Sequence, residues 1–173
     1  MSPNLKPQDL ALALRLAAVG DAPWTQPGMA DALHVNVSVV NHGLKRLVAC
    51  QLFNTHKRRV MREPLLEFLI YGLCHVFPAQ LGFFGRGMPT AFSAAPLLGK
   101  VRVGDDDGCV WEMPRGKVMA RGRVVAPLYP NAPKAAAKDP LLYEYLALAD
   151  TLRVGRARER AFARDELAKR LSS

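Results

Sequence analysis

The apolar residues between positions 26 and 50 predict two consecutive helices. They recur at spacings of three, four or seven residues, which is the period of one helical face, at Met29, Leu33, Val40, Leu44, Leu47 and Val48. The period is interrupted around 34–36, where Asn36 is a good N-cap because its side-chain oxygen can accept from free N–H groups of the next turn. The pattern therefore predicts helices at 26–33 and 37–50, joined by a three-residue turn.

A short basic hairpin is predicted directly after the second helix. Residues 52–54 and 59–61 suit two short strands, and the Thr-His-Lys-Arg segment at 55–58 suits a tight turn between them. Two helices followed by a basic hairpin form a winged helix-turn-helix. The alternative is an ordinary helical hairpin with a solvated basic face.

The N-terminal third of the chain resembles the MarR-like winged-helix transcription regulators. The matching residues are Met29-Ala30-Asp31-Ala32-Leu33, Ser38-Val39-Val40, Leu44-Lys45-Arg46-Leu47 and Gln51-Leu52-Phe53. The family usually has glycine where Gln51 stands, closing the recognition helix in a left-handed turn. The resemblance implies a winged-helix fold that regulates transcription by binding double-stranded DNA.

The rest of the chain is predicted to mix helices with short strands. An almost wholly apolar helix begins at Pro7 and ends near Gly20. A helix at 63–77 is apolar on several faces, so either the second half of the chain or a dimer partner must bury it. Three glycines and three prolines exclude a long regular element from 78–96, which is predicted to be a packed loop that buries Phe83, Phe84, Met88 and Phe92.

Strands and two helices are predicted beyond this loop. Residues 100–103 and 109–111 suit strands on either side of an Asp-Gly turn, and residues 117–120 and 123–126 suit another strand or hairpin. After a linker at 127–133, helices are predicted at 139–154 and 156–171.

These elements predict an α+β fold that is mainly α, with an N-terminal winged helix-turn-helix, a smaller β-hairpin and a helical C-terminal region. Residues 1–63 would form the DNA-binding domain. Residues 64–98 would supply a buried or dimerisation helix and the packed Gly/Pro-rich loop, and residues 99–173 the β-hairpins and two C-terminal helices.

Positive charge is concentrated in two stretches. The formal net charge is +9; residues 45–62 hold six cations and no acid, and residues 153–170 hold seven cations against three acids. Such focused charge is expected for a partner that is a polyanion, and neither stretch has the wide aromatic face of a membrane-binding helix. We therefore expect double-stranded DNA, and no membrane, as the partner.

The second helix and the hairpin supply the candidate DNA contacts. Polar side chains off the apolar stripe are predicted to reach base edges, and these are Ser38, Asn41, His42 and Lys45. Predicted phosphate contacts are Thr25, Arg46, His56, Lys57, Arg58 and Arg59. No acid nearby in sequence neutralises the hairpin cations.

Three further arginines are candidates for binding an anion or a partner carboxylate. Arg86 lies between two glycines, and Arg153 and Arg156 lie in the arginine-rich C-terminal stretch. For each, the alternative is a solvated arginine or one paired within its own helix.

Metal, cofactor and enzyme chemistry is not predicted. The three cysteines, Cys50, Cys74 and Cys109, are far apart and form no CxxC spacing. The aspartates at 105–107 lack the spacing of a calcium loop and are expected to form a solvated turn. No GxSxG, HExxH, P-loop or GxGxxG motif occurs.

Two functions follow from these observations. The first is a homodimeric, sequence-specific transcriptional repressor that binds double-stranded DNA, with helices 63–77 and 139–154 as candidate dimer elements. The second is a protein-interaction module, such as an antitoxin-like partner of a neighbouring gene product. The absence of a signal sequence and of a long apolar span predicts a cytoplasmic location.

Overall fold

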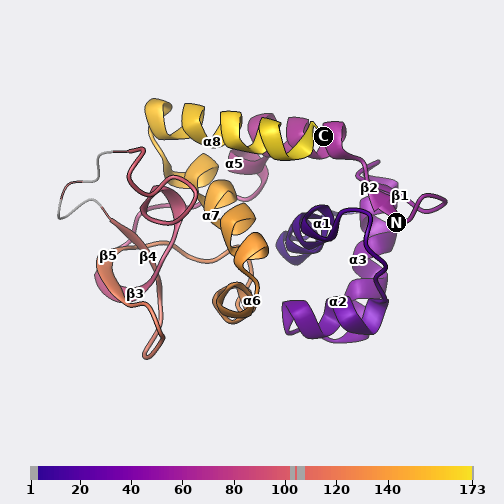
Figure 1. Ribbon diagram of the computed structural model, residues 1–173, viewed down its shortest axis with the longest axis horizontal. Coiled ribbons are helices and arrows are strands. Elements are labelled where there is room, and N and C mark those ends of the chain that lie inside the picture. Colours follow the sequence, from indigo (N-terminus) through magenta and orange to yellow (C-terminus); the bar gives the residue numbers. More distant parts are fainter. Residues whose placement is uncertain (1–3, 102–103, 105–107, 173) are drawn as a thin grey trace.

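The protein has an α+β fold that is mainly helical, as predicted, with 54% helix and 13% strand. The computed structural model describes residues 4–101, 104 and 108–172. The N-terminal helices and a two-stranded hairpin lie at one end of the long axis, a three-stranded sheet lies at the other, and the remaining helices bridge the two ends (Figure 1). One contiguous apolar core runs through the described residues.

The N-terminal end is built from α1 (Pro7–Val19), α2 (Gln26–Leu33), α3 (Val37–Ala49), β1 (Phe53–Asn54) and β2 (Arg59–Val60). The predicted helices and strands are therefore confirmed within one or two residues. Thr25 caps α2, because its side chain accepts from the Gly28 N–H. Asn36 precedes α3 as predicted, but its side chain makes no capping hydrogen bond.

Gln51 closes α3 in the left-handed conformation that glycine usually adopts at this position. Its φ is 59°, its N–H donates to the Val48 carbonyl, and the Leu52 N–H donates to the Leu47 carbonyl. These two bonds are those of a Schellman motif. A residue with a side chain thus replaces glycine here, at a cost of about 1–2 kcal/mol for this conformation.

The predicted helix at 63–77 is a continuous helical segment with a π-helical turn in its middle. It comprises α4 (Arg62–Glu67), the π-helical turn η1 (Phe68–Gly72) and α5 (Leu73–Val76). Leu65, Leu69 and Leu73 are almost completely buried on one face, where the segment contacts the C-terminal helices. The second half of the chain therefore covers much of this helix.

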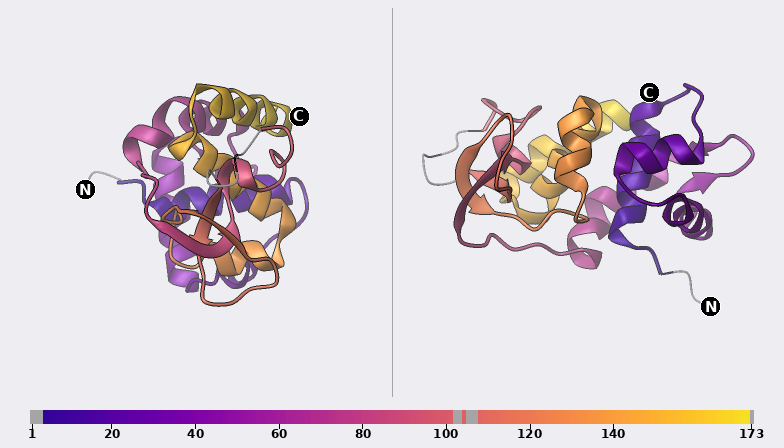
Figure 2. Two further views of the ribbon diagram at one scale, coloured as in Figure 1. Left: turned by 90° about the vertical axis from the view of Figure 1, so that its left-hand side faces the viewer. Right: turned by 90° about the horizontal axis from the view of Figure 1, so that it is seen from below.

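The three-stranded sheet corrects the prediction of a packed loop at 78–96. β3 (Phe84–Pro89) pairs antiparallel with both β4 (Cys109–Glu112) and β5 (Ala120–Val124), which are parallel to each other, so the three strands close on themselves. Figure 2 shows this sheet from its own end of the molecule. The glycines that seemed to break a strand instead permit it, because a Cβ at Gly87 would lie 1.7 Å from the Trp111 carbonyl oxygen.

Several local predictions in this half are also corrected. Phe83 and Phe84 are 64% and 42% exposed, although burial was predicted, whereas Phe92 is buried and Met88 half-buried. Residues 120–124 form one strand through Arg121-Gly122, so the segments 117–120 and 123–126 are not a hairpin. Val101 makes an isolated bridge to Leu98; residues 102–103 and the aspartates at 105–107 lie outside the described residues. Residues 91–93 form the short 3-10 helix η2 (Ala91–Ser93).

Helices complete the chain. α6 (Ala132–Lys138) begins inside the predicted linker and was not predicted, whereas α7 (Pro140–Val154) and α8 (Ala157–Leu171) match their predictions. Asp139 caps α7 by accepting from the Leu142 N–H. Most apolar side chains of α7 are buried within the chain, so this helix does not offer the free apolar face that the dimer prediction requires.

Candidate nucleic-acid interface

α3 divides into a buried face and an exposed polar face. Its buried residues, Val40, Gly43, Leu44 and Leu47, pack into the N-terminal core. The predicted base contacts Ser38, His42 and Lys45 are exposed, and their spacing of four and three residues places them on one helical stripe. α3 lies at the end of the molecule, with the hairpin beside it (Figure 1).

An ion pair between Asp9 of α1 and Arg46 fixes α3 against α1. The Asp9 carboxylate is 1% exposed and accepts from Arg46 Nε at 2.6 Å and from Nη2 at 2.8 Å. This hydrogen-bonded carboxylate raises the pKa of the Arg46 guanidinium. Gly43 allows the close approach, since a Cβ there would lie 2.9 Å from Asp9 Oδ1. Arg46 therefore has a structural partner, and we leave it out of the proposed phosphate contacts.

Two predicted base contacts are oriented by hydrogen bonds within the protein. Asn41 is half-buried and its side-chain amide donates to Gln26 Oε1 at 3.3 Å. His42 Nδ1 lies 2.8 Å from the Ser38 carbonyl oxygen. Since that oxygen can only accept, we assign the proton of the neutral ring to Nδ1, which leaves Nε2 as an outward acceptor.

The hairpin is short and is fastened to the turn before α2 by Trp24. The indole Nε1 donates to the Arg58 carbonyl at 3.0 Å, and the ring packs edge-on against Phe53. The Arg58 guanidinium lies 4.6 Å from the centre of the Trp24 ring and donates to its carbonyl. Asn54 tightens the turn by accepting from the Lys57 N–H. Trp24 therefore positions the hairpin and packs against the apolar core.

One acid distant in sequence, Asp21, neutralises part of the hairpin charge. Arg59 pairs with Asp21 at 3.0 Å, although both side chains are exposed. His56, Lys57 and Arg58 are exposed and form no ion pair among the described residues. A pocket of about 250 Å³ lies between this tip and the turn before α2, lined by Gly20, Asp21, Ala22, Pro23, Trp24, Lys57, Arg58 and Arg59.

The predicted arginines of the second half occupy three different environments. Arg153 is buried, pairs with Asp150 at 2.8 Å and donates to the carbonyls of Phe77 and Ala126, so it has a structural role. Burial raises the pKa of Asp150, and its bonds with Arg153, Thr90 and Trp111 oppose that shift. Arg156 is exposed at the start of α8, and Arg86 is exposed on β3, far from α3 (Figure 1).

Sequence reasoning missed the role of Asp9, the partner of Arg46. A buried acid in the first turn of an apolar helix is a usable signal, since such a charge needs a partner, but its identity depends on tertiary structure. Within the described residues, no group of three or more His, Cys, Asp or Glu side chains could hold a metal ion. No helix described here is long and apolar enough to cross a membrane.

Comparison of the chain with protein-family models, with curated protein sequences and with solved structures gave no match.

Proposed function

We propose that this protein is a transcriptional regulator that binds double-stranded DNA as a winged helix-turn-helix. The observation that supports this most is the exposed stripe of Ser38, His42 and Lys45 on α3, which lies beside a hairpin tip carrying His56, Lys57 and Arg58. In this arrangement α3 enters the major groove and the hairpin follows the adjacent backbone.

The side chains divide into two roles. Lys45 can donate to guanine, and His42 Nε2 can accept from the exocyclic amine of adenine or cytosine. Lys57 and Arg58 lie on the hairpin and line the pocket next to Trp24, where they can bind a phosphate. Asn41 can join the base contacts while it keeps its bond to Gln26, because its second amide N–H and its Oδ1 are not used in that bond.

Selection of duplexes from a random-sequence pool tests the proposal. We expect the protein to enrich one motif, and His42→Ala to lose about 1–3 kcal/mol on that motif and little on random DNA. The control is Lys117→Ala, because Lys117 is exposed on the β4–β5 connection, away from α3 and from the proposed dimer contact. Absence of any enriched motif, or an equal loss on both kinds of DNA, would contradict sequence reading by α3.

We further propose that two copies act together on two half-sites about one helical turn apart. Tyr71 and Val76 are 71% and 51% exposed on the helix that follows the hairpin. Val76 also lines a groove of about 850 Å³ with Phe68, Phe77 and Leu52. Sedimentation should show a dimer that Val76→Glu dissociates; a monomer both on and off DNA is the contrary result.

A further inference from the structure

A second basic surface lies on the three-stranded sheet, at the end of the molecule away from α3. Phe84 is opposite Arg123, and Arg86 is opposite Arg121, in the pairing of β3 with β5. Residues directly opposite each other in an antiparallel pair project from the same face. The guanidinium groups of Arg121 and Arg123 lie 5.9 and 5.1 Å from the centre of the Phe84 ring. One face of this ladder therefore carries three cations and an aromatic ring.

These cations have no acidic partner in the part of the chain that the structure describes. None of Arg86, Arg121 and Arg123 forms an ion pair there. Arg86 and Arg121 face each other, and like charges at opposite positions destabilise an antiparallel pair. A bound anion would relieve this repulsion, so the surface favours an acidic ligand.

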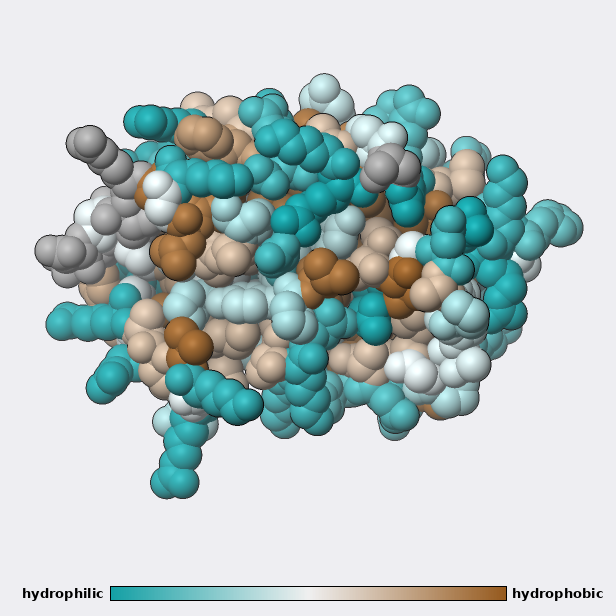
Figure 3. All heavy atoms as spheres, viewed as in Figure 1, coloured by the Kyte–Doolittle hydropathy of each residue, from teal (hydrophilic) through white to brown (hydrophobic). Residues whose placement is uncertain are grey.

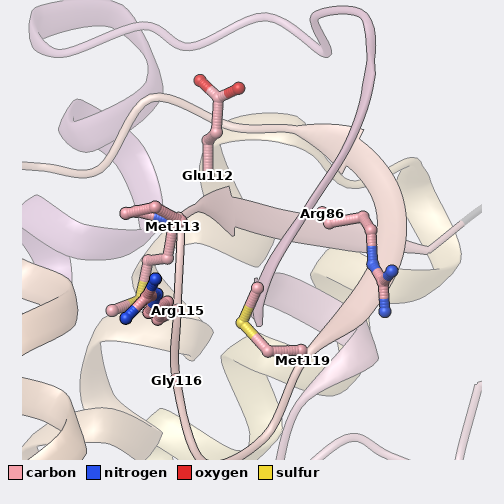
Figure 4. Close-up of a pocket in the computed structure, with 7 residues that line it drawn as sticks. Arg86, Glu112, Met113, Arg115, Gly116 and Met119 are labelled. Atoms are coloured by element: carbon pink, nitrogen blue, oxygen red, sulfur yellow. The ribbon is translucent and has the colours of Figure 1, made fainter.

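Arg86 also lines an open groove between β3 and the connection from β4 to β5. The groove has a volume of about 770 Å³ and is lined by Arg86, Glu112, Met113, Pro114, Arg115, Gly116 and Met119. In Figure 4, Met119 lies between the guanidinium groups of Arg86 and Arg115, and the Glu112 carboxylate points away from both. The groove therefore places the flexible thioether side chain of Met119 between two cations.

We propose that this groove and the adjoining face around Phe84 bind an acidic segment of a partner protein. Carboxylates of the segment pair with Arg86 and Arg115, whose planar guanidinium groups suit two-point binding of a carboxylate. An apolar side chain of the same segment rests on Met113 and Met119. The segment is bound through side chains, because all three strands of the closed sheet pair with both neighbours and strand addition has no free edge.

The composition of the groove favours a protein segment over a nucleic acid. Arginine, methionine and phenylalanine are enriched in protein–protein interfaces. A sugar–phosphate chain would satisfy the arginines but would leave the methionines without an apolar partner.

The two binding surfaces are at opposite ends of the long axis (Figures 1 and 2). Long hydrophilic side chains project from both ends (Figure 3). A duplex bound on α3 would therefore leave the groove free, and the protein can hold DNA and the partner at the same time.

Fluorescence anisotropy with the full chain tests the proposal. The probe is a short labelled peptide in which aspartates flank leucines, and its control has asparagine at every aspartate. We expect the acidic peptide to bind about tenfold more tightly than its control, and Arg86→Ala with Arg115→Ala to weaken it about tenfold. The matched variant removes two exposed arginines of α8, Arg158→Ala with Arg164→Ala, and should change the affinity less than about twofold.

A variant that keeps both arginines tests the groove floor. Met119→Asp places a negative charge between Arg86 and Arg115 and should also weaken the acidic peptide. Equal binding of the two peptides, equal losses in the groove and α8 variants, or unchanged binding by Met119→Asp would overturn the proposal. A thymidine oligonucleotide that binds more tightly than the acidic peptide, and loses affinity in the groove variant, would also overturn it by assigning the groove to nucleic acid.

Discussion

The Asp9–Arg46 pair sets the position of α3 relative to α1 and so aims the exposed stripe. Asp9 is almost fully buried, and its two oxygens accept from the Arg46 guanidinium and from the Lys6 N–H. Removing one partner leaves the other charge unpaired, whereas removing both leaves no unpaired charge and only the Lys6 N–H without its acceptor.

Asp9→Ala should therefore reduce the free energy of unfolding by about 3–5 kcal/mol, toward the lower value because Arg46 keeps some contact with water. The double variant Asp9→Leu with Arg46→Met should be closer to wild type than either single variant. Urea denaturation of all four proteins gives the coupling energy. Strictly additive losses would show that the pair does not act as a unit.

At this scale the sequence predicts the kind of side chain but not its partner. Residues with short-range roles have partners nearby in the sequence: Thr25 and Asp139 cap helices within three residues of themselves. The sequence predicts that Arg46 is a cation without an acidic partner. In the structure it pairs with Asp9, which is 37 residues away in the sequence. The local sequence around an arginine does not predict which distant acid the fold places next to it.

Close backbone approach, made possible by glycines, is what allows the three-stranded sheet to close. A Cβ at Gly87 would meet the Trp111 carbonyl, and a Cβ at Gly122 would lie 2.5 Å from the Gly108 carbonyl oxygen. Neither neighbour is the end of a flexible side chain, so neither can move away without breaking strand pairing.

Gly87→Ala should therefore destabilise the protein by several kcal/mol, on the order of the 4–5 kcal/mol that marks exceptional substitutions. Gly116→Ala is the control, because its Cβ would meet the flexible Met119 side chain at 3.3 Å. Thermal unfolding followed by circular dichroism compares the two. If Gly87→Ala melts like Gly116→Ala, the packing described for β3 is wrong.

Elements with a strong period can be predicted from this sequence, and elements defined by distant contacts cannot. α1, α2, α3, α7 and α8 follow helical spacing, and the side chains of Thr25 and Asp139 cap α2 and α7. β3 contains glycines and ends at Pro89, features that locally signal a break, and only its pairing with β4 and β5 makes it a strand. α6 was missed because Pro133 and a run of small residues hide its period.

Hydrogen bonds from the second half of the chain tie the α2–α3 turn to the rest of the molecule. Tyr129 donates to the Leu33 carbonyl at 2.9 Å, and Asn131 donates to the His34 carbonyl at 2.7 Å. Tyr143 donates to the Pro89 carbonyl and so ties α7 to β3. Burial raises the pKa of both phenols, to about 12 for Tyr143 and higher for Tyr129.

These shifts predict a loss of stability at alkaline pH. A folded-state pKa above the unfolded value of about 10 means that the unfolded chain loses its phenol protons first. The contribution of these tyrosines is therefore complete below about pH 10 and declines as pH rises toward 12. Urea midpoints at pH 9 and pH 11 should fall less for Tyr129→Phe with Tyr143→Phe than for wild type. An equal fall of the urea midpoint in both proteins would show that other groups cause the loss of stability at alkaline pH.

The central claim is that α3 and the hairpin bind DNA, and the salt dependence of affinity tests it most directly. Each phosphate contact contributes about 0.9 to the slope of log affinity against log salt. The proposed phosphate contacts Lys57 and Arg58 are exposed and form no ion pair among the described residues. The control pair, Lys117 and Arg158, is also exposed, on the β4–β5 connection and in the first turn of α8.

Changing Lys57 and Arg58 together to alanine should flatten the slope by up to about 1.8, whereas changing Lys117 and Arg158 should leave it nearly unchanged. A slope that stays the same in the first variant, or that falls equally in both, would contradict DNA binding by α3 and the hairpin.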